Sequence, residues 1–137
     1  MGFSGLVEDR LAIHELVKSY GDAVTRVDAD AWGGTWAEDA TWRIPDFPGL
    51  ELTQGRENIV KNWSAAMEGF NQIVFLATLG SLTVEGDTGK GVTYTQEYCT
   101  DKDDAKSIVL GRYEDQFVKQ NDRWYFNNRT YTQLDSL

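Results

Sequence analysis

The sequence has few of the residues from which metal sites and covalent cross-links are built. It contains one cysteine, Cys99, and one histidine, His14, so a disulfide cannot form within the chain. A metal site requires several histidine, cysteine or carboxylate ligands close together, and the sequence shows no such spacing, so we expect no metal. Cys99 also has no candidate histidine partner, so we expect no Cys–His nucleophile. A chain without disulfides is typical of a reducing compartment, which predicts a cytoplasmic protein.

Positive charge is also scarce, and long apolar runs are absent. Thirteen Lys and Arg residues against 22 Asp and Glu residues give a formal net charge of −9. An acidic surface repels the phosphates of nucleic acids and of anionic membranes, so we expect neither as a partner. No stretch approaches ~18 consecutive apolar residues, the length of a membrane-spanning helix. The first residues lack a basic region followed by an apolar one, so we expect no signal peptide.

Aromatic side chains, by contrast, are abundant. The 137 residues are enough for one domain over 1–137, and they include five Trp, six Tyr and six Phe. Aromatic side chains bury large areas, and Tyr and Trp keep a polar atom that can bind a ligand. This composition is typical of a domain that lines an internal cavity, and equally of a small core that its own side chains fill.

Helical patterns come first in the chain and strand patterns follow. Apolar residues at helical spacing predict a helix over 7–27 with Ser4 as its cap, a short helix over 30–37 capped by Asp28, and a third helix over 56–68. Strand patterns predict extended segments at 37–44, 50–55, 70–86, 91–100, 107–120 and 124–134. Helices followed by long antiparallel hairpins predict an α+β fold.

Five segments, in this order, resemble a known family. They are AIHELVKSY, VDADAWGGTWAEDATW, LTQGRENIV, LTVEGDTGKG and GRYEDQFVKQNDRWYFNNR. Together they resemble the SnoaL-like proteins of the nuclear-transport-factor-2-like superfamily, which include scytalone dehydratase and hexachlorocyclohexane dehydrochlorinase. The resemblance implies a cone, in which a strongly curved antiparallel sheet wraps over three helices and a deep pocket lies between them. It also implies a homodimer or homotrimer associated through the sheet, and chemistry without a metal or organic cofactor.

The resemblance also implies an Asp–His pair that this sequence lacks. In the family's enzymes the Asp lies near the end of the first helix and the His on the first long strand, where the pair acts as general base or acid. Carried over onto this chain, the Asp position falls on Thr25 and the His position near Phe75. His14 lies nearly three helical turns before Thr25 and cannot replace the missing residue. Gly21, one turn before Thr25, is costly inside a helix, and its missing side chain is expected to make room for a neighbour.

Aromatic and hydrogen-bonding residues at positions that face the pocket in relatives are the candidate binding residues. Trp42, Tyr113 and Arg129 match such positions, and Tyr20 lies on the apolar stripe of the first helix. Asn127, Arg129 and Tyr131 are two residues apart and would share one strand face. The full set of pocket candidates is Tyr20, Thr25, Trp42, Phe75, Tyr94, Tyr113, Asn127 and Arg129.

Two questions about charged groups stay open at the level of sequence. Arg129 either binds an anion or carbonyl in the pocket or forms a structural ion pair with Asp28 or Glu97. Glu97 and Asp115 are the acids on the strands, and either could act as a base if apolar surroundings raised its pKa. Alternation along 92–99 does not decide which side chains face inward, so the catalytic residues are unassigned.

Two functions therefore remain. The first is a protein that binds a small cyclic organic molecule in an open, aromatic-lined cavity of several hundred Å³, as a lyase, isomerase or cyclase relative with an altered or lost active site. The second is a non-catalytic binding or assembly domain whose cone is filled by its own side chains, among them Phe75, Trp42 and Trp63.

Overall fold

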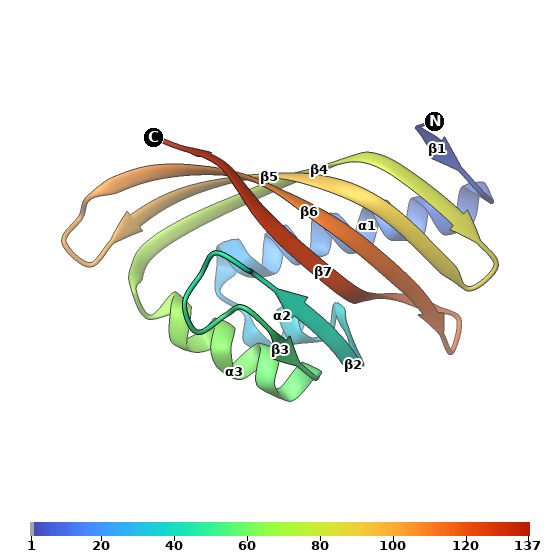
Figure 1. Ribbon diagram of the computed structural model, residues 1–137, viewed down its shortest axis with the longest axis horizontal. Coiled ribbons are helices and arrows are strands. Elements are labelled where there is room, and N and C mark those ends of the chain that lie inside the picture. Colours follow the sequence, from blue (N-terminus) through green and yellow to red (C-terminus); the bar gives the residue numbers. More distant parts are fainter. Residues whose placement is uncertain (1) are drawn as a thin grey trace.

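The computed structural model describes residues 2–137 as a curved sheet with three helices on its concave side (Figure 1). The helices are α1 Val7–Arg26, α2 Ala29–Gly33 and α3 Arg56–Met67. The strands are β1 Phe3–Ser4, β2 Trp36–Arg43, β3 Thr53–Gln54, β4 Phe70–Glu85, β5 Thr88–Asp101, β6 Lys106–Gln120 and β7 Arg123–Ser136. They pair in the order β1-β4-β5-β6-β7-β2-β3. The predicted α+β cone is confirmed.

The sheet is mixed, whereas we expected an antiparallel one. The four long strands β4 to β7 form antiparallel pairs, as predicted from their hairpins. However, β2 runs parallel to β7 and β1 runs parallel to β4. Neither of these two short strands is joined to its neighbour by a hairpin, so hairpin patterns could not predict their directions. Among residues 2–137, no helix is both long enough and apolar enough to cross a bilayer.

Helix α1 packs its apolar face against the concave side of the sheet. Its buried side chains recur every three or four residues and include Ile13, Leu16, Val17, Tyr20 and Val24. The helix ends where Val27 adopts a left-handed conformation with φ 51°. Asp28 then caps α2 as predicted, because its carboxylate accepts a hydrogen bond of 3.0 Å from the backbone NH of Ala31.

Two boundaries near the N-terminus differ from the prediction. Ser4 does not cap α1 but pairs with Thr83 in β1, and α1 begins after Leu6. The second helix ends at Gly33, and Trp36 already belongs to β2, opposite Phe126 of β7. Burial of the Trp36 ring between sheet and helices outweighs the weak helical preference of this glycine-containing segment.

Gly21 lets α1 approach the sheet closely, as the sequence predicted. A Cβ at this position would lie 3.1 Å from the backbone oxygen of Phe75 and 3.2 Å from its ring. One turn later, the Thr25 hydroxyl donates to the Gly21 carbonyl oxygen and accepts a hydrogen bond of 3.0 Å from the backbone NH of Phe75. The missing side chain therefore allows α1 to pack directly against the backbone of β4 at Phe75.

Replacing Gly21 with valine is expected to lower the free energy of unfolding by about 1–3 kcal/mol, because the added side chain must push Phe75 away. Urea denaturation measures the change. Ser19→Val is the matched control, since it introduces the same side chain on an exposed position of the same helix. Equal stability of the two variants would show that the close contact between α1 and β4 tolerates a side chain.

Candidate functional site

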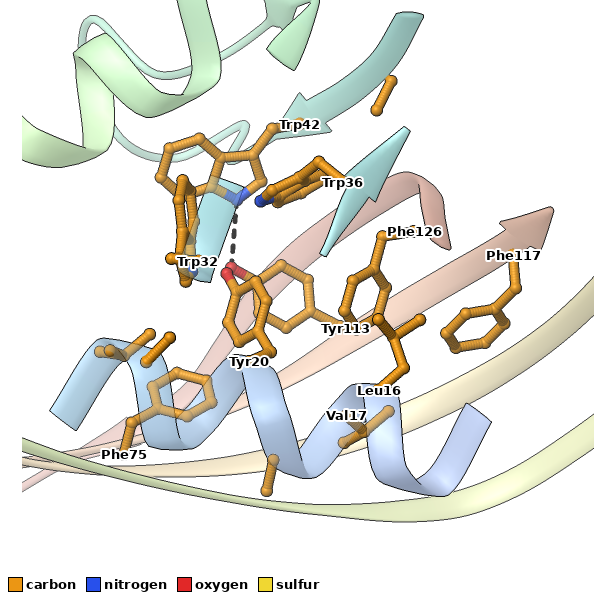
Figure 2. Packing of buried hydrophobic residues seen from close by; sticks show 14 of the residues in the cluster. Leu16, Val17, Tyr20, Trp32, Trp36, Trp42, Phe75, Tyr113, Phe117 and Phe126 are labelled. Atoms are coloured by element: carbon orange, nitrogen blue, oxygen red, sulfur yellow. Dashed lines mark hydrogen bonds between the residues drawn. The ribbon is translucent and has the colours of Figure 1, made fainter. Parts of the chain in front are cut away.

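Aromatic rings fill the space between α1, α2 and the strands β2 and β7, which we call the closed end of the cone. Figure 2 shows Tyr20 of α1 pointing toward the tryptophans of α2 and β2 and toward Phe126 of β7. Its ring centroid lies 5.4 Å from that of Trp32 and 5.3 Å from that of Phe126. Trp32 is 0% exposed and stacks on Trp63 of α3 at 4.4 Å. These contacts are packing interactions, and they hold α1, α2 and α3 together through their aromatic rings.

Arg129 and Asp115 form a buried ion pair beside this cluster. Arg129 Nε and Nη2 donate to the two carboxylate oxygens of Asp115 at 2.6 and 3.1 Å, and the Thr93 hydroxyl donates to the same carboxylate at 2.6 Å. The guanidinium lies 3.8 Å from the ring centroid of Tyr113 and 4.1 Å from that of Phe126. Of the two alternatives for Arg129, the structural ion pair is present, but its partner is Asp115, and the expected partners Asp28 and Glu97 were wrong.

This pairing removes Asp115 from the candidate bases. Both of its carboxylate oxygens already accept hydrogen bonds, from the Arg129 guanidinium and the Thr93 hydroxyl. Asp115 is 3% exposed and Arg129 is 0% exposed, and neither lines the cavity between α3 and the sheet. The pair therefore acts as an internal support beneath the aromatic rings.

An open cavity of about 180 Å³ lies between α3, the loop that follows β2, and the sheet. The loop and α3 form an apolar wall from Ile44, Phe47, Leu50, Trp63, Ala66 and Met67. The facing strands contribute Phe75, Glu97, Cys99, Val109, Tyr113, Tyr131 and Gln133, and Tyr20, Val24, Trp42 and Phe70 complete the lining. The cavity is smaller than the several hundred Å³ expected, and it is not closed by the rings of Phe75, Trp42 and Trp63.

Among residues 2–137, Glu97 is the only acidic side chain that lines this cavity. Burial shows which side chains along 92–99 face inward, a question that the sequence left open. Thr93, Thr95 and Cys99 are buried, whereas Tyr94 is 48% exposed. Glu97 therefore faces inward, between Phe75 of β4 and Val109 of β6. Burial in these apolar surroundings raises the pKa of Glu97 to about 7.

The polar atoms near Glu97 are weak acids. Burial raises the pKa of the Cys99 thiol to about 11, with a smaller contribution from Glu97, so the thiol is uncharged at neutral pH. Burial also raises the pKa of Tyr131, and the Glu97 charge adds to this effect. The Tyr131 hydroxyl has no hydrogen-bond partner within residues 2–137, and its ring lies against Gly111, where a Cβ would collide with it. The hydroxyl of Tyr131 is therefore buried against the backbone of β6, while other atoms of Tyr131 line the cavity.

Two further polar atoms of the lining are already paired. Trp42 Nε1 donates to the Tyr113 hydroxyl at 3.1 Å, a bond drawn in Figure 2. This bond fixes the Trp42 and Tyr113 side chains relative to each other. Burial raises the pKa of Tyr113 well above its ordinary value, so this hydroxyl stays protonated.

The structure brings together four of the eight candidate residues. Tyr20, Trp42, Phe75 and Tyr113 line the cavity. Tyr94 lies on the outer face of the sheet, where its ring packs against Gly80. Asn127 occupies an extra position in β7, because Gln116 pairs with Asn128 while Phe117 pairs with Phe126.

The β7 bulge explains why Asn127 does not share a face with Arg129, as alternation had predicted. Simple alternation placed Asn127, Arg129 and Tyr131 together, but the bulge moves Asn127 to a shallow groove with Lys90 and Gln116. Arg129 and Tyr131 do keep the inner face, opposite Asp115 and Tyr113. Thr25 lies outside the cavity lining and holds the backbone of β4.

Sequence reasoning did not include several lining residues among its candidates. Trp63 was treated as wall or core, and Phe47, Leu50 and Met67 were not considered as pocket residues. The signal for Met67 was present, because it follows Trp63 by four residues and so shares its helix face. Phe47 lies in the proline-containing loop after β2, where no periodic pattern predicts which side chains fold inward.

Metal ligands are not assembled near the cavity. Within residues 2–137, no group of three or more His, Cys, Asp or Glu side chains is placed to hold a metal ion. His14 lies apart from the cavity, with its Nδ1 2.9 Å from the carbonyl oxygen of Arg10 and its ring 5.6 Å from that of Phe3.

Comparison with known proteins agrees with this architecture. The model of the SnoaL-like domain matches residues 6–130. A proposed aromatic ring hydroxylase from Novosphingobium aromaticivorans is 26% identical, with a TM-score of 0.87 over 96% of this chain and 93% of its own. Among functionally curated proteins, no sequence is significantly similar.

More distant solved structures share the fold. A hexachlorocyclohexane dehydrochlorinase, LinA type 2, is 16% identical, with a TM-score of 0.83 over 96% of this chain and 88% of its own. A proposed scytalone dehydratase from Novosphingobium aromaticivorans is 15% identical, with a TM-score of 0.83 over 96% and 87% of the two chains. With the family match extending over most of its length, the chain belongs to the SnoaL-like domain family.

Proposed function

We propose that this protein binds a small organic molecule with a single ring in the cavity between α3 and the sheet. The observation that carries the proposal is the cavity of about 180 Å³ with aromatic side chains around it. A cavity of about 150 Å³ lined by apolar side chains is large enough for benzene. The ligand would enter beside Phe47, which lines the cavity and is 55% exposed.

A second candidate function is a cofactor-independent lyase or isomerase acting on such a molecule. The raised pKa of Glu97, about 7, supports it, because a group that titrates near neutral pH can both accept and donate a proton. The dehydrochlorinase and the proposed dehydratase among the structural relatives are of the lyase type. The reaction would differ from theirs in its acid–base group, since Thr25 and Phe75 occupy the positions that we assigned to the family's Asp–His pair.

A homodimer or homotrimer formed through the outer face of the sheet is part of the proposal. Leu76, Tyr94 and Tyr98 support it, because these large side chains are 51%, 48% and 41% exposed on the β4 and β5 strands. Exposed apolar side chains that cluster on one face are typical of protein–protein contacts. The cytoplasmic location expected from the single cysteine also stays a prediction.

Filling the cavity is the direct test of the binding proposal. Replacing Ala66 with phenylalanine puts a ring into the cavity from α3, so we expect the affinity for benzyl alcohol to fall by about tenfold or more. Chemical-shift titration of the protein with benzyl alcohol measures the dissociation constant.

Ala65→Phe is the matched control, because Ala65 is the preceding residue of α3, is exposed and does not line the cavity. It is expected to bind benzyl alcohol like the unmodified protein. Equal binding by both variants would place the ligand elsewhere, and absence of binding to the unmodified protein would contradict the proposal.

A further inference from the structure

The cavity contains one acid and no base. Glu97 lines it, whereas no Lys, Arg or His does so in the part of the chain that the structure describes. The nearest buried guanidinium, that of Arg129, is already paired with Asp115. The other titratable groups of the cavity, Cys99 and the tyrosines, are uncharged at neutral pH. An ionised Glu97 therefore has no positive partner on any of the elements around it.

The surroundings of Glu97 suit a cation. Aromatic rings attract cations through the negative electrostatic potential of their faces, and this attraction is strongest where water is excluded. Aromatic rings line the cavity, among them Trp42, Phe75 and Tyr131. Glu97 lines the same cavity as these rings and lies opposite Phe75 on the neighbouring strand β4. A carboxylate among aromatic rings is a typical arrangement for binding an ammonium group.

The charge of the whole protein supports the same ligand. A net charge of −9 raises the local concentration of small cations around the molecule and repels small anions. In the cavity, an unpaired carboxylate carries a desolvation cost that a bound cation would offset. A neutral ligand would leave this cost in place or would require Glu97 to be protonated.

We propose that the cavity binds a small amine in its protonated form, with one ring or a group of similar size, and that Glu97 is the counter-ion of its ammonium group. The proposal rests on the ligand-binding function proposed above and names the chemical class of the ligand. It assigns Glu97 to binding and so favours the binding function over proton transfer. The ring of the ligand would lie against the aromatic and apolar side chains of the same lining, among them Trp42 and Phe75.

Benzylamine and benzyl alcohol distinguish this ligand from a neutral one, because they have nearly the same shape and differ in charge. Titration calorimetry at pH 8 is expected to show benzylamine binding about tenfold more tightly than benzyl alcohol. Because the pKa of free Glu97 is about 7, benzylamine binding is expected to strengthen as the pH rises from 6 to 8 and then to stay level until the amine loses its proton.

Glu97→Gln is expected to remove both the preference for the amine and its pH dependence, while benzyl alcohol still binds and so shows that the cavity is intact. Glu114→Gln is the matched control, since it changes the net charge by the same one unit at an exposed position of β6. It is expected to keep the preference, which separates local pairing from long-range attraction.

The two proposals fail in different ways. If benzyl alcohol binds as tightly as benzylamine, or if Glu97→Gln keeps the preference, the assignment of an amine is overturned while the binding function stands. If Glu114→Gln removes the preference as fully as Glu97→Gln does, the preference comes from net charge and the local pairing is overturned. If neither compound binds, both proposals are wrong.

Discussion

Replacing Asp115 with asparagine is expected to lower the free energy of unfolding by about 3–5 kcal/mol. The substitution removes the charge that compensates Arg129, whose guanidinium is buried without any exposure to water. The side chain of residue 129 cannot turn toward solvent, because aromatic rings surround it at 3.8 to 4.5 Å. An unpaired charge in such a position costs far more than the loss of one hydrogen bond. Urea denaturation at pH 7 measures the difference.

The neighbouring residue provides the control for this experiment. Glu114 follows Arg112 on the outer face of β6, where its side chain is 63% exposed and lies 3.7 Å from the guanidinium. Exposed ion pairs contribute little, so Glu114→Gln is expected to change stability by less than about 1 kcal/mol. If Asp115→Asn were no more destabilising than Glu114→Gln, the buried pair would not support the fold in the way that its geometry indicates.

The second large effect is expected for Trp32. Replacing it with alanine should lower the free energy of unfolding by about 3–5 kcal/mol, because the ring is fully buried and the surrounding structure can collapse only partly. Trp32 contacts rings from α1, β2 and α3, with centroids 4.4 to 5.6 Å away, so its loss would leave a void where these elements meet. Thermal and urea denaturation both measure the change.

Tyr98→Ala tests whether this cost depends on burial rather than on removing an aromatic ring. Tyr98 is 41% exposed on the outer face of β5, so its replacement is expected to cost less than about 1 kcal/mol. The comparison also bears on the alternative of a cone filled by its own side chains. A small effect of Trp32→Ala would mean that the closed end of the cone is loosely packed, in conflict with the ring distances.

Sequence patterns predicted some residues of the site correctly and failed for others. Tyr20 was predicted to face inward from helical spacing, and Trp42 and Tyr113 from the resemblance, and all three line the cavity. For Tyr94, alternation along β5 left both faces open, and only packing of the sheet over α1 decided between them. For Asn127, a bulge broke the alternation on which the prediction depended. One inserted residue is enough to move a side chain to the opposite face.

The charged residues show the same limit more clearly. Glu97 and Asp115 were equivalent candidates in the sequence, since each is an acid on a predicted strand. In the structure Asp115 faces Arg129 across β6 and β7, whereas Glu97 faces Phe75 and Val109. Their chemical roles therefore differ because of which strands lie beside them, which is a property of strand pairing over long sequence separations.

By itself the sequence determined the family, the α+β class and the inner face of α1. Its single histidine, His14, also showed that the family's Asp–His pair is missing. These features follow from composition and from local periodicity, which depend on neighbouring residues along the chain. Only the tertiary structure decided that Glu97 lines the cavity without a charged partner among the described residues, that Arg129 pairs with Asp115, and that the cavity is small. Each of these depends on contacts between segments that pack together only once the sheet has curved over the helices, and curvature and bulges leave no periodic signal in the sequence.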